Sequence, residues 1–177
     1  MRRFIFLAII CMIAPVASIA QDLAANPLTA TVRETFNQYS KNLVATAEEM
    51  PEGKYGYHPT PEQMTFGKTI EHVAEVNNFA CAKFSDLSAP KGPKAAEADG
   101  KIKLIEGLKA SMDFCAEAFS KLTDAKLAEP VTIFGGRRTT RLGAAMEVTN
   151  DLIDHYAALA VYLRLNQLLP PTAQKKP

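Results

Sequence analysis

The 177-residue sequence has little excess charge, few histidines and no apolar run of the usual length of a membrane-spanning helix. It contains 20 Lys and Arg residues against 19 Asp and Glu, which gives a formal net charge of +1. Its basic cluster, Arg137, Arg138 and Arg141, falls in a segment that we expect to be a solvated loop. Nucleic acids and acidic membrane surfaces select extended basic surfaces, so the composition argues against both kinds of partner.

The longest apolar run lies at the N-terminus and is typical of a secretory signal peptide. Arg2 and Arg3 precede an apolar stretch at residues 4–16, and Ser18 and Ala20 are small residues at the −3 and −1 positions before Gln21. The run is shorter than the roughly 20 residues that a spanning helix needs. We therefore predict cleavage of residues 1–20 and a secreted or periplasmic protein that is not membrane-bound. A retained membrane anchor is the alternative.

Helical periodicity dominates the rest of the chain. Apolar residues recur at spacings of three and four over about residues 29–50, 66–87, 102–122 and 142–168, with Ile102 and Leu165 among the residues expected to face inward. Thr29 and Thr65 are the expected N-caps of the first two helices. Residues 51–64 and 88–100 are rich in turn formers, and residues 123–141 are irregular, with a brief extended stretch at 131–134 and a tight turn at Gly135.

These segments predict one all-α domain, a four-helix bundle over residues 29–171. A short lead at residues 21–28 would precede it, and a disordered polar tail at residues 172–177 would follow it.

Two cysteines, Cys81 and Cys115, remain after signal cleavage. In an oxidising compartment they would form one bridge, which closes a loop worth roughly 3–4 kcal/mol in the chain-entropy model. Two buried free thiols that act as small hydrophobic groups are the alternative.

The last helix carries a candidate metal site. Glu147, Asp151 and His155 are spaced four residues apart and therefore share one helical face. Asp151 and His155 could contact one ion together, and His72 from the second helix would complete a set that suits Zn²⁺, Fe²⁺, Ni²⁺ or Mn²⁺. The alternative is an ordinary surface ion pair between Asp151 and His155. The remaining histidine, His58, lies in the turn-rich loop, where we expect it to be exposed.

Three stretches of the sequence, residues 59–75, 134–143 and 155–171, together resemble the DinB-like superfamily, and particularly its exported members. The resemblance implies a four-helix bundle with an unusual connection order and a divalent metal held by three histidines. His72 and His155 match two of those histidines, whereas Asp151 stands at the position of the third. Ala157 and Ala158 also depart from the family pattern. Cys81 and Cys115 fall where exported members tend to carry paired cysteines.

Two functions follow from this resemblance. The first is a metal-dependent enzyme, hydrolase-like or transferase-like, in which Glu147 or Asp154 serves as a base or as a partner of the metal ligands. Export argues against a reaction that uses a low-molecular-weight thiol, since such thiols are mainly cytosolic. The second is a non-catalytic bundle with a degenerate metal pocket that binds a small ligand or a partner. A homodimer stays open, although no apolar stripe is plainly left over for it.

Overall fold

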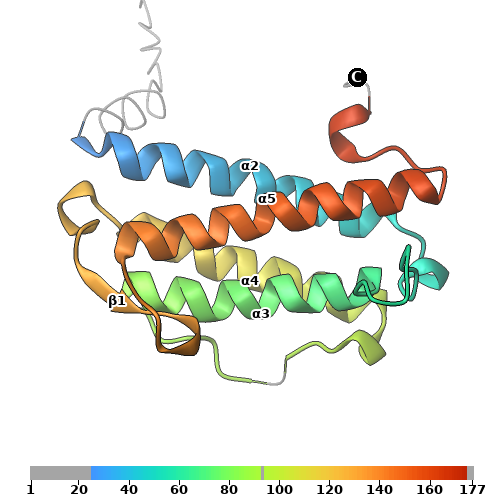
Figure 1. Cartoon of the computed structure of the whole chain (residues 1–177), viewed down its shortest axis with the longest axis horizontal. Coiled ribbons are helices and arrows are strands. Elements are labelled where there is room, and N and C mark those ends of the chain that lie inside the picture. Colours follow the sequence, from blue (N-terminus) through green and yellow to red (C-terminus); the bar gives the residue numbers. More distant parts are fainter. Residues whose placement is uncertain (1–24, 93, 175–177) are drawn as a thin grey trace, which may run out of the picture.

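The computed structural model describes residues 25–92 and 94–174, which form an all-α four-helix bundle, as predicted (Figure 1). The long helices are α2 (Pro27–Glu49), α3 (Phe66–Ser85), α4 (Lys101–Lys121) and α5 (Arg141–Leu165). Both α3 and α2 pack against α4 and α5, so α2 lies diagonally opposite α3, and α4 diagonally opposite α5. The predicted signal peptide lies outside the described residues, and no helix within them is long and apolar enough to span a membrane.

Short elements join these helices. They are the 3-10 turns η1 (Glu52–Lys54), η2 (Glu97–Asp99), η3 (Asp124–Lys126), η4 (Phe134–Gly136) and η5 (Pro171–Ala173), and the strands β1 (Pro130–Thr132) and β2 (Arg138–Thr140). The strands form an antiparallel hairpin in which Val131 lies opposite Thr139. Gly135 and Gly136 both have positive φ, at 63° and 76°, and provide the tight turn that the sequence indicates.

Of the two helix caps that the sequence predicts, one is present and the other is not. The Thr65 hydroxyl accepts a hydrogen bond from the backbone N–H of Lys68 at 3.0 Å and caps α3. The prediction that Thr29 caps α2 is wrong, because the helix already begins at Pro27, where the missing N–H costs nothing. The carboxylate of Asp124 accepts the free N–H groups of Leu28 and Thr29 instead.

The core is built around aromatic side chains. Phe119 of α4 packs against Phe36 of α2 and Phe84 of α3, with ring centroids 4.7 and 4.8 Å apart. Ile102 and Leu165 were expected to face inward, but they are 69% and 55% exposed. Each lies six residues from a buried leucine, Leu108 or Leu159, and six residues are about 1.7 helical turns, which rotates the side chain about a third of a turn away from that leucine.

Arg141 is not part of a solvated loop. It is 8% exposed and donates hydrogen bonds to the carbonyl oxygen of Phe84, to the carboxylate of Asp86 and to that of Glu129. These contacts join the hairpin and the start of α5 to the end of α3, and they satisfy a charge that would be costly to bury alone. Arg137 and Arg138 are exposed, as predicted.

The predicted disordered tail begins too early. Thr172 and Ala173 belong to η5, and the hydroxyl groups of Thr172 and Tyr156 lie 2.6 Å apart. This contact holds the turn against α5. Residues 175–177 lie outside the described residues.

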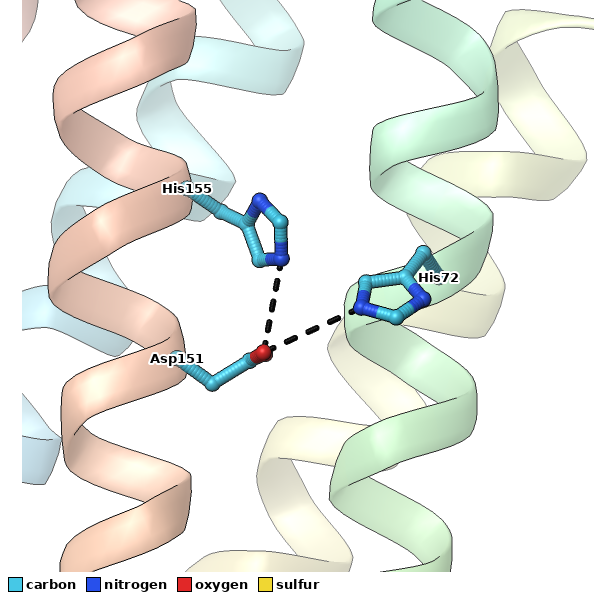
Figure 2. A group of neighbouring side chains, drawn as sticks. All are labelled: His72, Asp151 and His155. Carbon is cyan, nitrogen blue, oxygen red and sulfur yellow. Dashed lines mark ion pairs between the residues drawn. The ribbon is translucent and has the colours of Figure 1, made fainter. Parts of the chain in front are cut away.

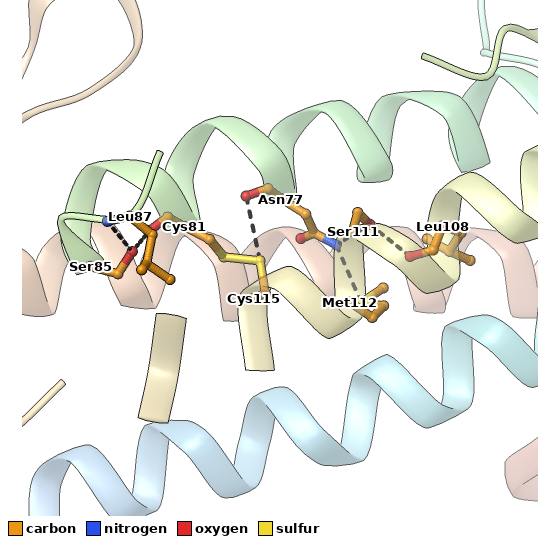
Figure 3. Close-up of a disulfide and its surroundings, with 8 residues drawn as sticks. All are labelled: Asn77, Cys81, Ser85, Leu87, Leu108, Ser111, Met112 and Cys115. Atoms are coloured by element: carbon orange, nitrogen blue, oxygen red, sulfur yellow. Dashed lines mark hydrogen bonds between the residues drawn. A yellow bond between two sulfur atoms is a disulfide. The ribbon is translucent and has the colours of Figure 1, made fainter. Parts of the chain in front are cut away.

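A disulfide joins Cys81 of α3 to Cys115 of α4, with Cα atoms 5.3 Å apart (Figure 3). Both residues are fully buried. One turn away, the Asn77 side-chain amide donates to the Ser111 hydroxyl at 3.1 Å. The α3–α4 contact therefore combines a covalent link with a buried polar pair.

Candidate metal centre

The three side chains that the sequence singles out as metal ligands meet between α3 and α5. One carboxylate oxygen of Asp151, Oδ1, lies 3.3 Å from Nε2 of His155 and 3.8 Å from Nε2 of His72 (Figure 2). One potential ligand atom from each residue lies within 4.8 Å of the others. The set therefore converges on one point, although His72 and Asp151 are far apart in the sequence.

Each of the three residues stands next to a buried residue on its helix. His72 precedes Val73 and Asp151 precedes Leu152, both of which are fully buried, and His155 precedes the buried Tyr156. The core residues face the bundle axis, so their neighbours lie at its edge, where one helix meets the next. The side chains are accordingly half-buried, at 38% exposed for His72, 20% for Asp151 and 13% for His155.

The electrostatics of the cluster centre on the Asp151 carboxylate. Hydrogen bonding to Asp151 raises the pKa of His155, although burial acts in the opposite direction, and the charge of Asp154 adds to the increase. The second carboxylate oxygen of Asp151, Oδ2, is buried and has no hydrogen-bond partner within the described part of the chain. A buried oxygen of this kind is unusual unless something else satisfies it.

These residues fit a divalent metal ion. Two imidazole nitrogens and one carboxylate form a ligand set that suits Zn²⁺, Ni²⁺, Fe²⁺ or Mn²⁺, and three protein ligands leave at least one coordination position for water or substrate. The oxygen without a partner, Oδ2, supplies an additional electron pair on the same carboxylate.

An open groove of about 440 Å³ lies beside the cluster. Its lining combines two of the metal-ligand candidates with an apolar wall and further polar groups: His72, Val76, Phe134, Glu147, Asn150, Asp151 and Asp154. The Phe134 ring stacks on Phe79 of α3 with centroids 4.2 Å apart, which fixes the apolar wall. Sequence reasoning missed Val76, Phe134 and Asn150. Val76 could have been found from the sequence, because it lies four residues after His72 and therefore on the same helical face.

The two acidic candidates for a base differ in their surroundings. The carboxylate of Glu147 lies 2.6 Å from the Arg137 guanidinium and is committed to that ion pair. Asp154 lines the groove without an ion pair among the described residues, and its charge acts on His155. The structure thus brings both residues to the groove, although neither belongs to the ligand cluster itself.

Comparison with known protein families assigns this chain. The family described as the DinB superfamily matches residues 35–159, a range that contains His72, Asp151 and His155. The chain belongs to the DinB superfamily. Comparison with curated protein sequences found no significant match.

Solved structures agree with this assignment at the level of the fold. A DinB-like protein from Bacillus subtilis superimposes with a TM-score of 0.64 at 18% identity, over 82% of this chain and 99% of that one. A DinB-like protein from Bacillus cereus gives 0.61 at 15% identity, over 88% and 95%. A mycothiol-dependent maleylpyruvate isomerase gives 0.59 at 15% identity, but the match covers 74% of this chain and only 60% of the isomerase.

Proposed function

We propose that this protein is an exported, divalent-metal-binding member of the DinB superfamily that acts on a small molecule in a hydrolase-like or transferase-like reaction. The observation that carries the proposal is the convergence of His72, Asp151 and His155 on one point beside an open groove. A structural ion pair would explain Asp151 and His155 alone. It would not explain why an imidazole from a second helix faces the same carboxylate oxygen.

The residues divide the work in a defined way. His72 and His155 supply neutral nitrogen ligands, and Asp151 supplies the negative charge that balances part of the ion's charge. When bound, a divalent ion supplies Lewis-acid chemistry to an oxygen or sulfur atom of the substrate. Val76 and Phe134 form the apolar wall that orients a substrate and limits its contact with water. Asp154 lines the groove and adds negative charge near His155.

Export is part of the proposal and rests on separate features. The charged start, apolar run and small residues before Gln21 form a signal-peptide pattern. The buried bridge between Cys81 and Cys115 supports the same compartment, since structural disulfides persist mainly in oxidising environments. An exported enzyme would not have ready access to a cytosolic thiol cofactor, so we propose a reaction that does not use one.

Metal analysis tests the metal site directly. Protein purified without a nickel column, and then exposed to Zn²⁺, Ni²⁺ or Mn²⁺ and desalted, should retain close to one metal per chain by mass spectrometry. His72→Ala and Asp151→Ala should lose it. His58→Ala is the matched control, because this histidine is exposed, lies outside the cluster and makes a hydrogen-bond contact with the carbonyl oxygen of Thr60. Circular dichroism verifies that each variant remains helical.

The alternative outcomes are equally clear. If the wild-type protein retains none of these metals after refolding in their presence, the pocket is degenerate and the protein is a non-catalytic bundle. Export is tested independently by N-terminal sequencing of protein recovered from the periplasm or medium of an expressing bacterium. The expected first residue is Gln21, whereas an intact Met1 in the membrane fraction would indicate a retained anchor.

A further inference from the structure

The outward face of α5 carries exposed apolar side chains among a few polar ones. Four large apolar side chains on it, Met146, Ile153, Val161 and Leu165, are 36% to 55% exposed. Ala157 is also exposed and lies between them. In Figure 1, α5 lies between α2 and α3, and no other element passes in front of it. Exposed apolar side chains that gather on one side of a helix often indicate a second partner.

The residues on this face are arranged symmetrically along the helix. Ile153 and Leu165 lie at equal distances from position 159, and so do Ala157 and Val161. The charged pair Asp154 and Arg164 has the same midpoint, with one acidic and one basic side chain ten residues, or about 15 Å, apart. Both are exposed, and neither has an ion-pair partner among the described residues. A second copy of this face, placed antiparallel to the first, would therefore set apolar residues opposite apolar residues and Asp154 opposite Arg164.

We propose that α5 packs antiparallel against α5 of a second copy of this chain, with the two-fold axis passing near position 159. In this isologous arrangement Ile153 lies near Leu165 of the second copy, and Ala157 lies near Val161 of the second copy. The small side chain of Ala157 lets the two helices approach closely. The Asp154 end of one helix lies beside the Arg164 end of the other, and the symmetry makes that pairing twice. A partner of unrelated sequence would not need this reversal symmetry.

The dimer would also complete the groove beside the metal ligands. Asp154 and Asn150 line that groove and are also exposed on the outward side of α5. A second copy of α5 placed there would form an additional wall at the groove's open side and bring its Arg164 toward Asp154. The groove would then be bounded by Phe134 at one edge and by the second subunit at the other.

Charge-swap variants test this arrangement by sedimentation velocity over a range of concentrations. The wild-type protein should be a dimer, and Asp154→Arg or Arg164→Asp should each weaken the dimer by about tenfold to a hundredfold, because each change places like charges together twice. The double variant D154R/R164D should recover the dimer, since the charges are exchanged but still opposite. Val161→Asp should give a monomer.

The control is Ile102→Asp, which places a charge at an equally exposed apolar residue on α4. This variant should remain a dimer. The proposal is overturned if the wild-type protein is monomeric throughout, if the double variant dissociates as readily as the single variants, or if Ile102→Asp dissociates as Val161→Asp does. All altered residues are exposed, so the folding of each variant can be verified by its thermal melt.

Discussion

The disulfide between α3 and α4 allows a quantitative prediction about stability. The bridge joins residues that are 34 positions apart. In the chain-entropy model, a closed loop of that length lowers the entropy of the unfolded chain enough to stabilise the fold by about 4 kcal/mol. The double substitution Cys81→Ala with Cys115→Ala removes the bridge and two buried sulfur atoms, so the loss should be at least that large. For a domain of this size, about 4 kcal/mol corresponds to a fall in Tm of about 10 °C.

Chemical unfolding in guanidinium chloride measures this loss. The sequence has no tryptophan, so far-ultraviolet circular dichroism of the helices is the better signal. The oxidised wild-type protein should unfold at a higher denaturant concentration than the same protein in a reducing agent. The double alanine variant is the control, because its midpoint should not respond to the reducing agent. If the oxidised and reduced wild-type proteins unfold at the same midpoint, the bridge either is absent or does not constrain the unfolded chain.

Three further predictions concern the anchoring arginine, the acid limb of stability and the metal ligands. Arg141→Met keeps much of the side-chain volume but removes charge-assisted hydrogen bonds, so it should lower the free energy of unfolding by about 2 kcal/mol, and an unchanged denaturation midpoint would contradict the anchoring role. Hydrogen bonds from Lys68 and Arg141 lower the pKa values of Glu71 and Asp86. The stability that these ionised carboxylates provide at neutral pH should therefore be lost as the pH falls below about 4. Urea unfolding from neutral to acidic pH measures this loss, and a higher free energy of unfolding at acidic pH would contradict the prediction. Asp151→His supplies the third imidazole of the family pattern and should raise the affinity for Ni²⁺ or Zn²⁺ about tenfold in a competition titration with a chelating dye, whereas weaker binding would mean that the carboxylate is essential.

The positions of the helices could be predicted from the sequence because each helix obeys a local rule. Spacings of three and four identify an inward face, and Thr65 and the turn formers mark helix ends within a few residues. The same rule placed Asp151 and His155 on one face of one helix. It could not place His72 beside them, since no local pattern says which helices are neighbours. We included His72 as the ligand that a facing helix could supply, and the resemblance to DinB-like proteins favoured the same choice; the observed α3–α5 packing agrees with it.

The errors occur where contacts between elements decide the outcome. Arg141 belongs to a cluster of arginines that looks solvated, and only the fold reveals that Asp86 and Glu129 lie beside it. Leu165 continues the apolar character of α5 but falls on its outward face. That misassignment also hid the outward stripe, because a residue counted as core is not available for an interface. Patterns in sequence show that a residue is apolar, but the neighbouring helices decide whether it is covered.

The β1–β2 hairpin contacts both α3 and α5, the two helices that hold the metal-ligand candidates. At its tip, Phe134 stacks on Phe79 of α3, while Arg137 pairs with Glu147 of α5. At its base, Arg141 joins the start of α5 to the end of α3. The distance between His72 and the residues of α5 therefore depends on this hairpin as well as on the core. Residues 134–143 resemble the family although they lack helical periodicity. A role in holding α3 and α5 at a fixed distance explains why an irregular segment would carry a family pattern.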